Sequence, residues 1–206
     1  GGRGGSVAHT VPAETHARLV ELARRSGASL FMAVQAGLAA LLTRLGAGTD
    51  IPLGSPVAGR TDDAVRDLVG CFVNTLVLRT DTAGDPTFAE LLARVRESDL
   101  TAYAHAELPF EHLVDELKPA RSLARQPLVQ VVLSFQNAAG PLPGMAGVTA
   151  SVESVPSTTA KFDLSFEVTE RAAADGAPGG LDILLEYSAD LFTEATADRV
   201  AHALAT

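Results

Sequence analysis

The apolar segment at residues 29–45 constrains the fold more than any other part of the sequence. Ser29 can cap a helix, and the apolar side chains that follow recur at helical spacing, with alanines on nearly every other side: Phe31, Val34, Leu38, Leu41, Leu42 and Leu45. A helix of this kind must be covered on most of its circumference. Gln35 within the run and Arg44 after it make the segment too short and too polar to cross a membrane. The chain therefore needs other layers to pack around this helix.

The rest of the chain supplies both helices and strands for these layers. Apolar spacing and capping residues predict helices at residues 12–27, 29–45, 87–104, 109–117 and 193–204. Period-two alternation predicts strands at residues 51–57, 71–79, 128–136, 148–155, 162–168 and 181–187. This order predicts an α/β fold, a mixed β-sheet with helices packed on it. The strand at 71–79 is apolar on both faces, which predicts a central position in the sheet.

The start of the chain is glycine-rich and lacks the apolar core of a signal peptide. We expect residues 1–10 to be a linker or a cloning remnant, ahead of one folded unit at residues 11–206. A chain of 206 residues, 47% of them hydrophobic, is large enough to bury a core.

Charge and cysteine content exclude several classes of function. The chain has 16 Lys and Arg against 25 Asp and Glu, a formal net charge of −9, which makes nucleic acid and an anionic membrane surface poor partners. Cys71 is the only cysteine, so no intramolecular disulfide and no thiolate zinc cluster can form, and we expect a reducing, cytoplasmic location. Within the predicted strand at 71–79, Cys71 should behave as a small buried hydrophobe.

The residues alone give little support for catalysis. None of the five histidines is adjacent to another or spaced as a metal-binding helical pair, so no metal site is predicted. The nucleophile-elbow, P-loop and dinucleotide-binding motifs are all absent from the sequence. His105 and His112 flank Pro109 and Phe110, and either could be a base near a substrate; an exposed or helix-capping position is the favoured reading.

The strand at 128–136 carries the one polar stripe that stands out. Alternation places Val129, Val131, Leu133 and Phe135 on one face, and Gln130, Val132, Ser134 and Gln136 on the other. The polar face of such a strand either meets solvent or lines a polar cleft, and the residues themselves leave both readings open.

Three segments, in order, resemble late motifs of the condensation domains of non-ribosomal peptide synthetases. Val69-Gly-Cys-Phe-Val-Asn-Thr75 is similar to the V-G-x-F-V-N-T motif, and His105-Ala-Glu-Leu-Pro-Phe-Glu111 resembles H-Q-D-x-P-F-E with two departures. Arg121-Ser-Leu-Ala-Arg-Gln-Pro-Leu-Val-Gln130 resembles the S-R-N-P-L-F-Q stretch. Three shorter segments also fit the family: Gly54–Arg60, Lys161–Leu164 and Tyr187–Phe192.

The resemblance implies a chloramphenicol-acetyltransferase-like fold of two lobes and a reaction between two carrier proteins. In this family, an acceptor amine attacks a donor thioester, each held on a phosphopantetheine arm, and an amide forms in the synthesis of secondary metabolites such as antibiotics. The signature H-H-x-x-x-D-G lies in the first lobe of these domains, and no such pair occurs here. The chain therefore resembles the C-terminal, acceptor-side lobe at residues 11–206, expected to be inactive alone and to bind no cofactor itself.

The resemblance also implies partners and alternatives. The expected partners are the N-terminal lobe of the same domain, donor and acceptor carrier proteins and a neighbouring adenylation domain, with a homodimer through the exposed lobe interface as a further expectation. A non-catalytic condensation-like platform that recruits a carrier protein or a tailoring enzyme is the alternative. An epimerisation domain is disfavoured, because its corresponding motif lacks the F-V-N-T sequence found here at Phe72 to Thr75.

Site residues follow from the same resemblance. The segment 54–74 would include the loop that floors the tunnel, and the segment between Gln136 and Phe162 would supply a latch that crosses to the other lobe. The tunnel-lining candidates are Asn74, Gln130, Ser134 and Gln136; for Asn74, a side-chain bond to the backbone that fixes the floor loop is an equal alternative. The residues expected to have structural roles are Gly70, Phe72, Pro109, Phe110, Glu111, Arg121 and Arg125, with the two arginines pairing with carboxylates such as Glu111 or Asp115.

Overall fold

The computed structural model describes residues 2–60, 63–65, 67–120, 125–137, 147, 158–173 and 175–206. The helices are α1 (Ala13–Arg25), α2 (Leu30–Arg44), α3 (Phe88–Tyr103), α4 (Phe110–Leu117) and α5 (Glu194–Ala205), with a short 3-10 turn at Asp63–Val65. The strands are β1 (Gly2–Val11), β2 (Asp50–Val57), β3 (Asn74–Asp81), β4 (Val131–Gln136), β5 (Thr159–Ala160), β6 (Leu164–Ala172) and β7 (Pro178–Ser188).

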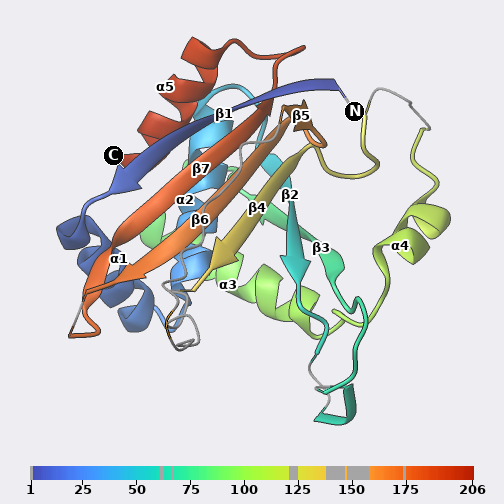
Figure 1. The fold of residues 1–206 in the computed structure, drawn as a ribbon, viewed down its shortest axis with the longest axis horizontal. Coiled ribbons are helices and arrows are strands. Elements are labelled where there is room, and N and C mark those ends of the chain that lie inside the picture. The colour runs from blue at the N-terminus through green and yellow to red at the C-terminus, as the bar shows by residue number, and fades with distance from the viewer. Residues whose placement is uncertain are drawn as a thin grey trace.

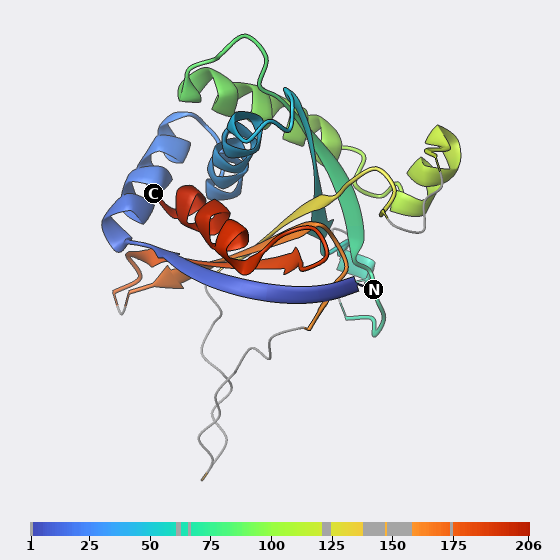
Figure 2. The same cartoon turned by 90° about the horizontal axis from the view of Figure 1, so that it is seen from above.

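The strands form one mixed sheet in the order β3-β2-β4-β6-β7-β1-β5. The pairs β2–β4 and β4–β6 are parallel, whereas β2–β3, β6–β7, β1–β7 and β1–β5 are antiparallel. Figure 1 views the sheet with helices behind it, and Figure 2 shows α2, α3 and α5 gathered on one side of the strands. The predicted α/β fold, a mixed sheet with helices packed on it, is therefore confirmed.

The core lies between the sheet and the helices. Phe166, Leu133 and Leu185 contribute fully buried side chains from the sheet, and Leu38 and Ala201 meet them from α2 and α5. A second apolar cluster joins α1, α2 and α3 on the far side of α2. The segment at 29–45 is thus covered on most sides, as its composition predicts. No single helix among the described residues is long and apolar enough to span a membrane, although α1 and α2, bent by 105°, pass that test as a pair.

The five predicted helices and the strands predicted near β2, β4, β6 and β7 are present. The strand predicted at 148–155 lies outside the described residues.

The expectation that residues 1–10 form a linker or a cloning remnant is wrong. Residues 2–11 are β1, which pairs with β7 from Gly4 to Val11. Its glycines lie where other groups approach closely: a Cβ at Gly4 would overlap the backbone of Thr159, and one at Gly5 would overlap the Tyr187 hydroxyl. Glycine content here serves close packing in a strand rather than chain flexibility.

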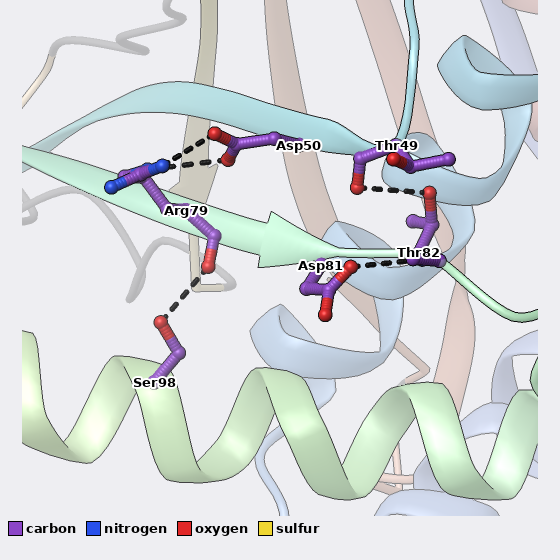
Figure 3. Close-up of polar contacts among 7 residues, drawn as sticks. Thr49, Asp50, Arg79, Asp81, Thr82 and Ser98 are labelled. Carbon is purple, nitrogen blue, oxygen red and sulfur yellow. Dashed lines mark hydrogen bonds and ion pairs between the residues drawn. The ribbon is translucent and has the colours of Figure 1, made fainter.

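The predicted central position of the strand at 71–79 is also wrong. β3 begins only at Asn74 and is an edge strand of the sheet. Helix α3 lies alongside it, and Ser98 Oγ donates to the Arg79 carbonyl oxygen at 2.9 Å (Figure 3). Arg94 Nη1, also from α3, donates to the carbonyls of Asp81 and Ala83 at 3.2 and 2.8 Å. Leu76 and Leu78 are buried on one face of β3, whereas Val77 on the other face is half-buried and Val73 is exposed. Helix α3 also satisfies edge carbonyls that could pair with another chain.

A substitution in α2 should stabilise the fold. Gly37 lines an apolar cavity of about 130 Å³ between the helices and the sheet, and a Cβ there would meet its nearest atom, Leu204 Cδ1, at 3.9 Å. Gly37→Ala should raise the free energy of unfolding by about 1 kcal/mol, because alanine favours the helix and fills part of the cavity. Gly46→Ala is the opposite control, since Gly46 has φ 93° and alanine would be strained there. Urea denaturation measures both, and a destabilised Gly37→Ala would contradict this account.

Candidate functional site

The face of the sheet that turns away from the helices carries polar side chains. Val131, Leu133 and Phe135 of β4 contact the core, so Ser134 and Gln136 point to the opposite face, as the alternation predicts. Neighbouring strands continue the polar surface through residues in register with β4: Ser165, Glu167, Thr169, Asp182 and Glu186. These side chains are half-buried, three of them are carboxylates and Asp182 pairs with Arg171 at 3.4 Å, so this face is a polar surface, with Leu184 as an apolar member.

The carboxyl ends of parallel strands β2, β4 and β6 meet at one end of the sheet. Ser134 and Gln136 lie toward this end, Gln136 exposed and Ser134 with its hydroxyl 3.4 Å from the Phe166 carbonyl oxygen that accepts its hydrogen bond. Carboxyl ends of parallel strands are the usual place for ligands in α/β sheets. The loop 58–73, which joins β2 to β3, and Asn74 lie at this same end (Figure 1).

Gln130 does not belong to this group. It precedes β4, about 20 Å from Gln136 along an extended chain, and its Nε2 donates to the Gln126 carbonyl oxygen at 2.8 Å. The structure thus brings Asn74, Ser134 and Gln136 to one end of the sheet and places Gln130 at the other.

A shallow pocket lies on the polar face near Gln130. It has a volume of about 160 Å³ and is lined by Ala160, Lys161, Phe162, Ser165 and Glu186. A hydroxyl, a carboxylate and an ammonium group around one small pocket can bind a polar group by hydrogen bonds.

Asn74 makes four hydrogen bonds to the backbone. Its Nδ2 donates to the carbonyls of Ala106 and Leu108 at 2.9 and 2.7 Å, and its Oδ1 accepts from the amides of Thr75 and Phe110 at 2.8 and 3.1 Å. Every donor and two lone pairs of the amide are used. These contacts favour the backbone-bonding alternative for Asn74. The segment that Asn74 fixes is residues 106–110, between α3 and the start of α4, rather than the expected floor loop.

The predicted structural motif around Gly70 and Phe72 surrounds one arginine. Arg60 Nη2 donates to the Gly70 carbonyl oxygen at 3.1 Å, and its guanidinium lies 4.4 Å from the centre of the Phe72 ring. The prediction that Cys71 is a buried strand residue is wrong: Cys71 is exposed and lies in the loop, because β3 starts three residues later.

The second motif forms the start of α4. Pro109 is the N-cap residue, Phe110 is half-buried and Glu111 lies in the first turn, where the helix dipole favours a carboxylate. His105 and His112 are both exposed, which agrees with the favoured reading of these histidines. Arg125 makes no ion pair with a described carboxylate, contrary to the expected pairing with Glu111 or Asp115, and Arg121 lies outside the described residues.

The structure reveals a buried polar cluster that the sequence patterns did not predict. Gln35 Nε2 donates to Thr80 Oγ1 at 3.3 Å and to Asp99 Oδ1 at 3.0 Å, and Gln35 and Asp99 are fully buried. Burial raises the pKa of Asp99 to about 6, although the Gln35 hydrogen bond opposes this. The one signal in the sequence is Gln35, a polar residue in the middle of a buried helix, which by itself argues only against a membrane span.

Histidines from distant parts of the chain also meet. The rings of His9 and His202 lie 5.4 Å apart, and His9 Nε2 is 2.8 Å from Asp198 Oδ1. Among the described residues, no group of three or more His, Cys, Asp or Glu side chains could hold a metal ion.

A sequence profile of the Condensation domain family matches residues 3–206. The chain belongs to this family. The match includes β1, which also corrects the expected start of similarity near residue 11. Ser134, Gln136, Asn74 and the loop 58–73 are accordingly parts of a condensation domain.

Its relatives are peptide synthetases. The chain is 55% identical to a "Probable non-canonical nonribosomal peptide synthetase (NRPS) CymA" of Salinispora arenicola, over 97% of this chain and 3% of that protein. It is also 55% identical to a "Dimodular nonribosomal peptide synthase" of Bacillus subtilis, over 98% of this chain and 8% of that protein. The chain therefore spans only a small part of these synthetases.

Solved condensation-like domains share the fold. The X-domain from teicoplanin biosynthesis, solved in complex with OxyB, superposes with a TM-score of 0.89 at 38% identity, over 98% of this chain and 44% of that one. A four-domain nonribosomal peptide synthetase bound to AMP and glycine superposes with a TM-score of 0.84 at 24% identity, over 98% of this chain and 16% of that one, which shows the fold alone.

Proposed function

We propose that this chain is the C-terminal, acceptor-side lobe of a condensation domain that forms amide bonds between carrier-bound aminoacyl or peptidyl thioesters. The observation that carries this proposal is the 55% identity with two nonribosomal peptide synthetases over nearly the whole chain. In this reading, the phosphopantetheine arms belong to the carrier proteins as part of the substrates.

The polar end of the sheet suits one half of such a site. Attack of an amine on a thioester needs alignment of the two groups, stabilisation of the oxyanion and an acceptor for the amine proton. Ser134 and Gln136 offer hydrogen bonds at the carboxyl ends of the parallel strands, and Ser165 and Glu186 offer others in the pocket toward the opposite end of the same face. These side chains can bind and align an acceptor arm.

The histidine of the family's signature must come from another lobe. The sequence contains no H-H-x-x-x-D-G, and His105 and His112 are exposed on the α3–α4 side of the sheet. This lobe therefore contributes binding and alignment, and the proton acceptor is contributed across the lobe interface.

An assay with loaded carrier proteins tests the proposal. The chain alone should form no detectable dipeptide, whereas the chain joined to a lobe that carries H-H-x-x-x-D-G should form it, because alignment without the histidine leaves the amine proton with no acceptor. Mass spectrometry of the acceptor carrier protein measures the product. Turnover by the chain alone would contradict the proposed division of labour, and a joined domain that binds acceptor carrier but forms no product would contradict the catalytic role.

A platform that recruits another protein is the second candidate. It is favoured by the superposition on the X-domain, which is solved in complex with OxyB. Binding experiments separate the two candidates. A platform should hold a tailoring enzyme in a joined domain that forms no amide, whereas a catalytic domain should bind loaded carrier proteins and release product.

A further inference from the structure

We infer that Arg60 is a positioning residue that holds the described residues of the loop 58–73 (58–60, 63–65 and 67–73) in one shape at the end of the sheet where the acceptor arm would be aligned. The role of the loop in aligning the acceptor arm rests on the proposed function. The claim that Arg60 fixes the loop rests on contacts within the loop. The loop is long, and apart from the short turn at Asp63–Val65 its described residues have no regular structure. Loops of this length are usually either functional or mobile.

The Arg60 side chain bonds three carbonyl groups spread along the loop. Nη1 donates to the carbonyl oxygens of Val65 and Leu68 at 2.6 and 2.9 Å, and Nη2 donates to that of Gly70 at 3.1 Å. A guanidinium can do this because its donors form a rigid planar fork, whereas a lysine ammonium has a compact charge on a flexible stem. One side chain thus ties together segments five to ten residues away.

The two ends of the loop close on the same arginine. The Phe72 ring lies under the guanidinium at 4.4 Å, a cation–π contact. Gly59, next to Arg60, has φ 66°, and a Cβ there would overlap the Phe72 carbonyl oxygen. Glycine at position 59 therefore allows the backbone at residues 59 and 72 to approach closely, and the contact between Arg60 and Phe72 stabilises this approach.

The position of the closed loop connects it to the site. Val57, at the end of β2, pairs with Asn74, at the start of β3, so the loop leaves and re-enters the sheet beside Asn74. Asn74 in turn fixes the α3–α4 connection through Ala106 and Leu108. Arg60 and Asn74 therefore shape two neighbouring loops at the carboxyl end of β2, the end that also carries Ser134 and Gln136.

The single cysteine provides a direct test. Cys71 is exposed and lies between Gly70 and Phe72, so a nitroxide spin label on it reports motion of the loop. Arg60→Lys keeps the charge but loses the fork, and should shorten the rotational correlation time of the label at least about threefold. Arg18→Lys, on an exposed arginine of α1 paired with Glu14, is the matched control and should leave the spectrum unchanged. Phe72→Leu should mobilise the label, and Phe72→Tyr, which keeps the ring, should not.

The catalytic readout is taken in the two-lobed domain. Arg60→Lys should lower kcat for amide formation roughly tenfold with little change in KM for the donor carrier, because a mobile loop misaligns the acceptor. Unchanged thermal unfolding of the variant confirms that the fold is intact. An unchanged label spectrum in Arg60→Lys overturns the inference, and so does a mobile loop with unchanged kcat. An inactive wild-type domain counts against the proposed function instead, and the label spectra then decide whether Arg60 holds the loop.

Discussion

Replacing Asp99 by Asn should raise the free energy of unfolding by about 3 kcal/mol at pH 8 and change it little at pH 4. Asp99 is fully buried, its Oδ2 has no hydrogen-bond partner, and its pKa is raised to about 6 from an ordinary value of 3.8. Below pH 3.8 the folded and unfolded states both bind the proton. Between pH 4 and 6 the unfolded state loses the proton first, so stability falls as pH rises. The two pKa values differ by about 2, and each pH unit between them costs about 1.36 kcal/mol, which gives the full effect.

Asparagine mimics the protonated acid. Gln35 Oε1 and Asp99 Oδ2 are both buried acceptors without a donor. A proton on Oδ2, or the amide of asparagine, replaces a charged acceptor by a neutral donor, while Oδ1 still accepts from Gln35 Nε2. The variant should therefore keep the bond between α2 and α3 at every pH.

Urea denaturation from pH 4 to pH 8 checks this expectation. The quantity to compare is the difference between variant and wild type at each pH, because other carboxylates change both curves together. Asp115→Asn, at an exposed position of α4, is the control and should follow the wild-type curve. A difference between Asp99→Asn and wild type that stays constant with pH would show that the buried carboxyl does not titrate in this range.

The second large effect should come from Asn74→Ala, which we expect to lower the free energy of unfolding by about 2–3 kcal/mol. Four hydrogen bonds are lost, each contributing about 0.5–1.5 kcal/mol, and water can replace some of them because the 106–110 connection is partly exposed. Helix α4 has no buried residue, so Asn74 is a main polar tether of this region. Hydrogen exchange in the segment 104–117 should rise more than in α2.

Two variants sharpen the result. Asn74→Asp replaces the Nδ2 donor by an acceptor that faces the Ala106 and Leu108 carbonyls, so at pH 7 it should be at least as destabilising as alanine. Asn137→Ala, at an exposed asparagine after β4, should change stability by less than about 0.5 kcal/mol. Full stability of Asn74→Ala together with a loss of amide formation in the two-lobed domain would instead favour the tunnel-lining role of Asn74.

Local patterns predicted most of the fold because the spacing of apolar residues in a segment reflects which of its faces are buried. The apolar residues around α2 required a helix buried on most sides, and the alternation in β4 placed Leu133 in the core and Ser134 on the polar face. The predictions were wrong where the burial of a segment depended on a neighbouring element that is distant in sequence. β3 is buried on one face only and lies at the edge of the sheet beside α3, and the glycines of β1 are strand residues because Tyr187 and Thr159 pack against them.

For the candidate site too, the sequence identified residues but not their contacts. Motif resemblance found Asn74, Gly70 and Phe72, but it could not say what they bind, since their partners lie up to 36 residues away. Arg60 ends the segment Gly54–Arg60 that fits the family, but its role depends on carbonyl partners five to ten residues away that the motif does not reveal. Gln130 was grouped with Gln136 by alternation, although the two lie at opposite ends of the strand.

By itself, the sequence determined the class of fold, the order of its helices and main strands, the polar face of β4 and the resemblance to condensation domains. These depend on periodicity and on short motifs, which are local properties of a chain. Only the tertiary structure decided which strand lies at the edge, that Asp99 is buried against Gln35, and that Arg60 and Asn74 shape adjoining loops at one end of the sheet. Each of these is a contact between residues distant in sequence, and its energy depends on burial and geometry that only the folded chain provides.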